Sequence, residues 1–240
     1  MNPDRRVVRI AHAYGNSRES LQRALSADVD MIEVDAWYRG GEIYIRHARR
    51  LNPFPILYDK VMRGHDPGWA IRFGRYYVRP DFGTLELDEV LEATAGRKSL
   101  LLDLKGHYHS PDVDGYVETL VRKIRSHSAE GWVAVCGQTY AVLNRFRKVT
   151  TDIELRYSIE KQYQWESFLR KMARDLSVRR VCIAHGFIDA EKARVMEENG
   201  VDLYCWTVDS RERAAELVAQ GVDGIISNDL GLLERLPRDG

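Results

Sequence analysis

Short β-branched segments alternate with helical segments along almost the whole chain. Eight segments have the apolar, β-branched character of buried strands: residues 7–11, 31–34, 100–104, 132–136, 153–157, 180–184, 202–207 and 223–227. Other segments carry apolar residues at the spacing of one helix face: residues 17–27, 87–94, 113–124, 138–148, 162–176, 189–199 and 210–219. This alternation predicts repeated βα units and a mainly parallel sheet.

The number of units favours a closed barrel over an open sheet. Eight strands in 240 residues is the usual allotment of a (β/α)8 TIM barrel. An open, doubly wound sheet usually has a glycine-rich phosphate loop after its first strand, and this chain has HAYGN at residues 12–16. We therefore predict an α/β barrel in a single domain, residues 1–240, with residues 43–45 as a hairpin arm after the second strand.

One stretch, residues 48–83, interrupts the alternation. It holds seven basic and three acidic residues, with aromatic side chains interleaved. A long insert in a compact barrel is commonly a cap that faces the substrate. A solvated loop with a small core of its own explains the composition equally well, and the sequence leaves both interpretations open.

Charge and cysteine content restrict the compartment and the partners. The 36 basic residues are balanced by 36 acidic ones, so the chain lacks the basic surplus of a general nucleic-acid binder. No apolar stretch approaches the roughly 20 residues of a membrane helix. Cys136, Cys182 and Cys205 lie in strand-like segments, which predicts buried free thiols. We expect a soluble, cytoplasmic protein with a small-molecule substrate, and its oligomeric state stays open.

Two acidic side chains share one face of the second strand. Glu33 and Asp35 are two residues apart in the segment IEVD, and alternate residues of a strand project the same way. Their apolar neighbours face the helices, so both carboxylates point into the barrel near its C-terminal end. Like charges this close repel, and burial adds a desolvation cost. A divalent cation relieves both effects, and oxygen ligands alone indicate Mg²⁺ or Ca²⁺.

The next strand repeats this arrangement. Asp103 and Lys105 share a face in the segment LLDLK, so Asp103 offers a third carboxylate to the cation. Lys105 offers a fixed positive charge that suits a phosphate oxygen. For Lys105 alone, an internal ion pair with the carboxylates is an equally good interpretation. One lysine cannot neutralise three carboxylates, however, which favours a metal site.

Two histidines complete the group of candidate residues. His12 ends the first strand and His47 follows the hairpin arm. Phosphoryl chemistry near neutral pH profits from one base and one acid, and two imidazoles supply both. His185, just after the sixth strand, is a further candidate for the barrel mouth. The remaining histidines rank lower: His65, His107, His109 and His127.

The order of these segments resembles the glycerophosphodiester phosphodiesterase superfamily, which includes the sphingomyelinase D-like phospholipases. The resemblance begins with IAH at 10–12 and IEVD at 32–35 and continues through IRH at 45–47, GTLE at 83–86 and DLK at 103–105. It ends with WTVD at 206–209 and GVDGIISN at 221–228. The resemblance implies a (β/α)8 barrel that cleaves phosphodiesters with two histidines and one divalent cation.

The resemblance also assigns a role to each matching residue. The acid/base pair is His12 and His47, and the metal ligands are Glu33, Asp35 and Asp103. Lys105 contacts the phosphate, and Trp206 lines the pocket, a position that the pattern alone places in the core.

Departures from the family pattern leave the branch open. Ala13 stands where typical glycerophosphodiesterases have an arginine, whereas Asn16 and Asp103 are similar to the sphingomyelinase D-like branch. We expect a metal-dependent phosphodiesterase that releases the head-group alcohol and a glycerol phosphate from a glycerophosphodiester or lysophospholipid. The alternatives are a phospholipase that forms a cyclic phosphate, and a barrel that binds a phosphorylated ligand without turnover.

Overall fold

A closed barrel forms the centre of the structure, a computed structural model that describes residues 6–51, 53–62, 68–106 and 112–237. In this part of the chain, eight parallel strands make up the barrel: β1 (Val8–Ala11), β2 (Met31–Arg39), β9 (Ser99–Lys105), β10 (Val133–Gly137), β11 (Glu154–Ile159), β12 (Arg180–Ala184), β13 (Asp202–Trp206) and β14 (Gly224–Ser227). The ring closes where β1 pairs with both β14 and β2. The predicted (β/α)8 fold and its strand segments are confirmed.

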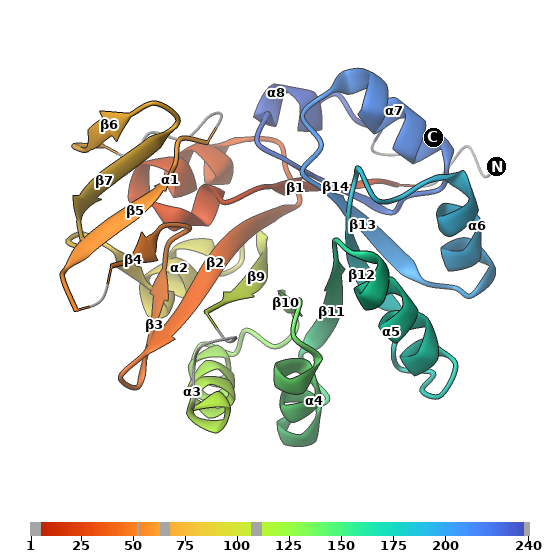
Figure 1. The fold of residues 1–240 in the computed structure, drawn as a ribbon, viewed down its shortest axis with the longest axis horizontal. Helices are drawn as coiled ribbons and strands as arrows, with labels where there is room; N and C mark the ends of the chain where they lie inside the picture. The colour runs from red at the N-terminus through yellow and green to blue at the C-terminus, as the bar shows by residue number, and fades with distance from the viewer. Residues whose placement is uncertain (1–5, 52, 63–67, 107–111, 238–240) are drawn as a thin grey trace.

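Helices surround the barrel (Figure 1). They are η1 (Tyr14–Asn16), α1 (Arg18–Ser26), α2 (Leu87–Thr94), α3 (Val113–Ser126), α4 (Tyr140–Val149), α5 (Gln162–Met172), α6 (Ala190–Glu198), α7 (Arg211–Ala219) and α8 (Leu230–Leu233). Side chains that accept a first-turn N–H fix where several of them begin: Ser17, Asp112, Asp189, Ser210 and Asp229. These caps anchor the loops that follow the barrel strands. Among the described residues, no helix is long and apolar enough to cross a bilayer.

The second strand extends beyond its predicted end. Residues 31–34 were expected, but β2 continues to Arg39 because it pairs antiparallel with β3 (Glu42–Ile45), as the predicted hairpin arm requires. Gly40 and Gly41 both have positive φ, which suits the tight turn between the two strands. The short β8 (Leu85–Glu86) then pairs with β3. Arg46 follows β3 directly, and its backbone N–H donates to the carbonyl of Asp35 on β2.

The described part of the 48–83 insert forms a second, antiparallel sheet. Its strands are β4 (Arg49–Arg50), β5 (Ile56–Lys60), β7 (Tyr76–Pro80) and β6 (Ile71–Phe73), in that order across the sheet. Figure 1 shows it at the left edge of the molecule, on the side of β3 and away from α4 to α7. Residues 52 and 63–67 lie outside the described part. The assignment of the insert as a cap, within one domain, stays a prediction.

Alternate residues of the barrel strands fill the interior. One buried cluster consists of inward-facing residues from successive strands: Ile10, Met31, Leu101, Ala134, Cys136, Cys182, Tyr204 and Ile226. The same alternation points the next residues of three strands, His12, Glu33 and Asp103, inward toward the C-terminal end. The cysteines are buried and free, as predicted.

A guanidinium group is buried near the N-terminal end of the barrel. The Arg156 side chain is 1% exposed, and its Cζ lies 3.4 Å from the ring centroid of Tyr204. Its Nε donates to Glu154 at 2.7 Å, and its Nη2 donates to Asp202. These two carboxylates and the ring satisfy a cation that burial alone would disfavour.

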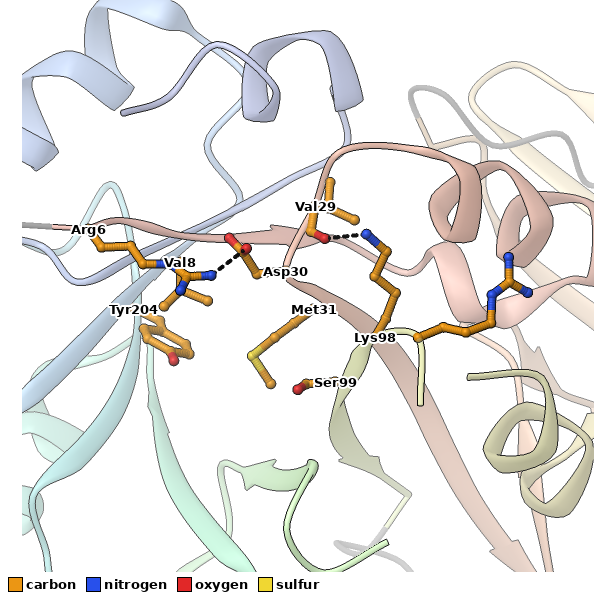
Figure 2. Close-up of a pocket in the computed structure, with 9 residues that line it drawn as sticks. Arg6, Val8, Val29, Asp30, Met31, Lys98, Ser99 and Tyr204 are labelled. Carbon is orange, nitrogen blue, oxygen red and sulfur yellow. Dashed lines mark hydrogen bonds and ion pairs between the residues drawn. The ribbon is translucent and has the colours of Figure 1, made fainter. Parts of the chain in front are cut away.

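A depression beside this end contains charged groups that are already paired. Figure 2 shows Arg6 against Asp30, and the Lys98 ammonium against the carbonyl of Val29. Lys98 donates to that carbonyl at 2.6 Å and to the carbonyl of Ala27 at 3.1 Å. Arg6, Asp30 and Lys98 therefore bind the protein itself, and the predicted functional residues lie at the other end of the barrel.

We expect Arg156→Met to lower the free energy of unfolding by about 2 kcal/mol, less than for a fully buried ion pair because Glu154 and Asp202 keep contact with water. Urea unfolding followed by circular dichroism measures the loss. Arg194→Met, which removes an exposed pair with Glu198 on α6, should cost less than about 0.5 kcal/mol. Equal losses in the two variants would contradict the importance of the buried contacts.

Candidate active site

Three carboxylates meet at the C-terminal end of the barrel. Glu33 and Asp35 come from β2, and Asp103 lies directly across from Asp35 in the β2–β9 pairing. One oxygen of each residue lies within 4.8 Å of an oxygen of the other two. Glu33 and Asp35 are buried, whereas Asp103 is partly exposed. Strand alternation thus brings together the carboxylates that the sequence predicts to be neighbours.

A single lysine faces this group. The Lys105 ammonium contacts Asp103 and lies 2.8 Å from Oδ1 of Asp35. Burial lowers the pKa of Lys105, but the charges of Asp103, Asp35 and Glu33 outweigh burial and hold the pKa well above its usual value. Lys105 is therefore a permanent cation. It forms the internal ion pair that the sequence allowed, but it offsets only one of three negative charges.

The remaining negative charge affects Glu33 most. Burial, followed by the charges of Asp35 and Asp103, raises the pKa of Glu33 well above its usual value. Burial also acts to raise the pKa of Asp35, but the Lys105 charge outweighs it, so this pKa is lowered. In the absence of a further cation, the surroundings of Glu33 therefore favour its protonated form and those of Asp35 the charged form.

The loop after β1 binds the carboxylates from one side. Ala13 has a left-handed φ of 58°, and its backbone N–H donates to Oε2 of Glu33. Asn16 and Asp35 exchange two hydrogen bonds: the side-chain amide of Asn16 donates to Asp35 Oδ2, and the backbone N–H of Asp35 donates to Asn16 Oδ1 at 2.9 Å. These contacts fix the orientation of two of the three carboxylates.

Close packing of this loop depends on a glycine. A Cβ added to Gly15 would lie 1.8 Å from Cγ1 of Val34, on the strand that carries the acidic pair. Only a residue without a side chain lets η1 approach β2 this closely. The adjacent Asn16 can then reach Asp35.

The chemistry of the group suits a hard cation. Oδ1 of Asp35 is buried and has no hydrogen-bond donor among the described residues, although the Lys105 ammonium lies 2.8 Å away as an ion-pair partner. The three side chains offer only oxygen ligands, which favour Mg²⁺- or Ca²⁺-type ions over softer metals. Glu33, Asp35 and Asp103 could therefore hold one divalent cation.

A second acidic group differs from the first because cationic side chains already contact it. Glu42, Glu86 and Asp88 also have carboxylate oxygens within 4.8 Å of one another. The Lys123 ammonium contacts both Glu42 and Asp88, and His127 contacts Asp88 at 3.0 Å. Cationic side chains thus already occupy this group, which lies on the outside of the barrel.

A relay of polar groups holds the first histidine. Asn228 donates its side-chain N–H to Oδ2 of Asp209, at 2.9 Å, and this turns its Oδ1 toward Nδ1 of His12, also at 2.9 Å. Nδ1 must then carry the hydrogen, which leaves the lone pair on Nε2. Burial lowers the pKa of His12, although the bond to Asn228 opposes this effect. The neutral imidazole is the favoured form.

A carboxylate holds the second histidine. Nδ1 of His47 contacts Oδ2 of Asp59, which lies on β5 of the insert. Burial acts to lower the pKa of His47, but the bond to Asp59 and the charge of Asp35 outweigh it, and the pKa is raised. The pKa values of the two imidazoles are therefore shifted in opposite directions, although the charge of His47 also acts on His12.

The other predicted residues lie around the same rim. Trp206 ends β13 and packs against the interior cluster, and its buried Nε1 has no acceptor among the described residues. His185 is fixed through its backbone, which donates to the Trp206 carbonyl at 2.6 Å. Its imidazole makes no hydrogen bond in the described part of the chain, so its predicted role stays a prediction. Three lower-ranked histidines lie outside the described residues: His65, His107 and His109.

Sequence reasoning did not assign several residues that shape this site. Asp209 and Asn228 lie in the segments that carry the family resemblance, and Asn16 marks its branch, but none of the three received a role. Asp59 had no signal at all, since it belongs to the insert and is twelve residues away from His47 in sequence. Its contact arises only from the folding of the second sheet.

Comparison with known sequences identifies a family. The profile of the glycerophosphoryl diester phosphodiesterase family matches residues 79–232. A curated glycerophosphodiester phosphodiesterase from Caldanaerobacter subterraneus subsp. tengcongensis is 27% identical over 238 residues, which cover 94% of this chain and 93% of the relative.

Comparison with solved structures agrees on the fold. A protein from Silicibacter pomeroyi superposes with a TM-score of 0.76 at 20% identity and covers 98% of this chain and 93% of its own. An Oleispira antarctica phosphodiesterase, solved with the product sn-glycerol-3-phosphate, has a TM-score of 0.68 at 16% identity, with 95% of each chain covered. At these identities the structural likeness shows a shared barrel.

We expect NMR titration of the metal-free protein to separate the two imidazoles. His12 should titrate below the ordinary pKa of about 6.5, because of burial, and His47 above it. Asp59→Asn should lower the pKa of His47 by about 1 or more, since it replaces the carboxylate that favours the imidazolium.

The matched control is Asp81→Asn, which changes an insert carboxylate that pairs with Arg50 and not with His47. The pKa of His47 should stay unchanged in this variant. Equal pKa values for the two histidines in the wild type would contradict the assignment.

Proposed function

We propose that this chain, which belongs to the glycerophosphoryl diester phosphodiesterase family and is a phosphoric diester hydrolase, cleaves glycerophosphodiesters or lysophospholipids. In this proposal, two histidines at the C-terminal end of the barrel act as the general acid and the general base. The observation that carries the proposal is the unequal pair of imidazoles beside the acidic group. An amide holds His12 and a carboxylate holds His47. Two titratable groups with separated pKa values are the arrangement that acid/base catalysis requires.

His12 acts as the base in this proposal. Its Nε2 lone pair takes the proton from the attacking hydroxyl, either of water or of the substrate's own glycerol. In the second case a cyclic phosphate forms first, and a water must then open it to give the glycerol phosphate. His47, as the imidazolium, gives its proton to the alkoxide that leaves when the phosphorus–oxygen bond breaks. Asp209, through Asn228, and Asp59 keep each ring in the tautomer and orientation that its task needs.

The metal and the lysine have separate tasks. A divalent cation, when bound by Glu33, Asp35 and Asp103, supplies a Lewis acid that offsets negative charge on the phosphate. Lys105 contributes a permanent positive charge next to two of these ligands, where a phosphate oxygen can share it. Trp206 provides an apolar wall with one unpaired N–H at the same rim.

Asn16 favours a second candidate function. An asparagine at this position resembles the pattern of the sphingomyelinase D-like branch. Asn16 also exchanges two hydrogen bonds with Asp35. In that reaction the substrate's neighbouring hydroxyl attacks the phosphorus, the head-group alcohol leaves, and the product is a cyclic phosphate. The same two histidines serve both reactions, so the nature of the product distinguishes them.

We expect the purified protein to convert glycerophosphocholine or lysophosphatidylcholine in the presence of Mg²⁺ or Ca²⁺. ³¹P NMR of the products separates an open monoester from a cyclic phosphate. His12→Ala and His47→Ala should each lower kcat by about 10²–10⁴-fold, the usual contribution of one general acid or base.

The control variant is His127→Ala, which removes an imidazole that pairs with Asp88 on the outside of the barrel and should leave kcat unchanged. Turnover near the wild-type rate in both His12→Ala and His47→Ala would rule out the two-histidine mechanism. Tight binding of a phosphorylated ligand without any turnover would favour a binding barrel instead.

We expect Mg²⁺ or Ca²⁺ to stabilise the folded protein, since a cation relieves the repulsion among three carboxylates. At a free concentration of one hundred times Kd, the gain in free energy of unfolding is about 2.7 kcal/mol. Thermal unfolding with added cation or with EDTA measures this gain. EDTA should also abolish turnover, and the cation should restore it.

Asp35→Asn should remove most of this thermal response, whereas Glu42→Gln, in the acidic group that Lys123 neutralises, should keep it. A wild-type unfolding midpoint indifferent to both cations would exclude the proposed metal site.

A further inference from the structure

Exposed apolar side chains concentrate on the insert. Of the ten large hydrophobic residues that are exposed in the described part of the chain, eight belong to residues 48–83: Leu51, Phe54, Ile56, Val61, Trp69, Ile71, Phe73 and Phe82. Trp69 is 73% exposed and Phe73 is 51% exposed. Apolar residues scattered singly over a surface are ordinary, but a cluster on one segment indicates an interaction site.

The strand register places three of these residues, Ile56, Ile71 and Phe73, on one face of the sheet. Partners in an antiparallel pair share a face, and Tyr58 pairs with Val78, Val78 with Ile71, and Tyr76 with Phe73. We call this face, together with Ile56 and Pro80, the outer face of the insert sheet. The opposite face carries the buried Leu57 and Tyr77 and also Asp59.

This arrangement is unusual for a sheet in contact with water. An antiparallel sheet that packs on one side normally has polar residues on the other. Here apolar side chains occupy both faces, and the stacked Phe73 and Tyr76 rings lie among the outward ones. The outer face therefore has the composition of a surface that another body covers.

The charges around the outer face are positive. Arg49 lies on it, opposite Tyr58, and Lys60 lies opposite Tyr76. Both side chains are exposed, and neither makes an ion pair within the described residues. The described acidic residues of the insert are engaged elsewhere, Asp59 with His47 and Asp81 with Arg50.

We propose that the outer face of the insert sheet docks on an anionic lipid surface. Aromatic rings partition into the headgroup region of a bilayer, and exposed basic residues beside them are attracted to anionic lipids. A second copy of this chain is a poorer occupant, because a two-fold interface would bring the same positive charges against one another. The combination of rings and cations therefore fits lipid best.

Docking at this face would place the candidate active site at the lipid surface. The inner face of the same sheet carries Asp59, which contacts His47, so one thin layer separates the outer face from the imidazole. The inference that docking delivers a lipid phosphodiester rests on the proposed function. The docking itself depends only on the insert.

Vesicle flotation tests the docking. The wild-type protein should float with vesicles of phosphatidylcholine and phosphatidylglycerol, bind vesicles of phosphatidylcholine alone more weakly, and lose binding at high salt. Removal of the exposed rings in Trp69→Ser/Phe73→Ser should weaken binding roughly tenfold. Arg49→Gln/Lys60→Gln should weaken it about fivefold for each charge removed.

The matched control is Tyr163→Ser/Leu176→Ser, which removes the two exposed large hydrophobic residues outside the insert, 63% and 85% exposed. This variant should bind as the wild type does. Wild-type protein that fails to float with anionic vesicles overturns the proposal, as does an equal loss in the control. Self-association that the ring variant abolishes, without any vesicle binding, would assign the face to a second copy instead.

A separate assay keeps this proposal distinct from the proposed function. Turnover of water-soluble glycerophosphocholine should be unchanged in the two insert variants, whereas turnover of micellar lysophospholipid should fall with their binding. His12→Ala should bind vesicles as the wild type does. If the wild-type protein floats but cleaves neither substrate, the docking holds and the proposed function fails.

Discussion

The confinement of three carboxylates with one ammonium inside the barrel is the constraint on which the candidate site depends. Glu33, Asp35 and Asp103 converge because strand alternation points all three side chains into the barrel and the β2–β9 register sets them side by side. Lys105 offsets part of their charge, and burial together with the remaining negative charge raises the pKa of Glu33. The same negative charge acts on His12 and His47. The pKa shifts at the mouth thus follow from burial, from this group of charges and from the separate hydrogen bonds that hold each imidazole.

The insert sheet joins this electrostatic centre to the surface of the molecule. Its inner face supplies Asp59, the carboxylate that favours a charged His47, and its outer face presents rings and cations to the surroundings. The protonation of His47 and the character of the outer face therefore both depend on this one sheet. A change that displaces β5 alters both the contact between Asp59 and His47 and the outer face of the insert sheet.

Most of the barrel could be predicted from sequence because its periodicity is simple. Strands such as β9 and β10 are short apolar runs bounded by amphipathic helices, so their type is unambiguous. The same alternation located Glu33, Asp35, Asp103 and Lys105. The second sheet escaped prediction because its strands are only two to five residues long and no amphipathic helices separate them. Contacts such as Asn228 with His12 could not be derived, since they join the first and last strands only when the barrel closes.

The stacked Arg156 and Tyr204 lie inside the barrel at the end away from the candidate active site. Arg156 is a buried cation, and two carboxylates of the same strands, Glu154 and Asp202, contact it. At the opposite end, three carboxylates face one ammonium. One barrel therefore contains a positive charge that its own strands balance and, at the other end, an excess of negative charge that they leave unbalanced.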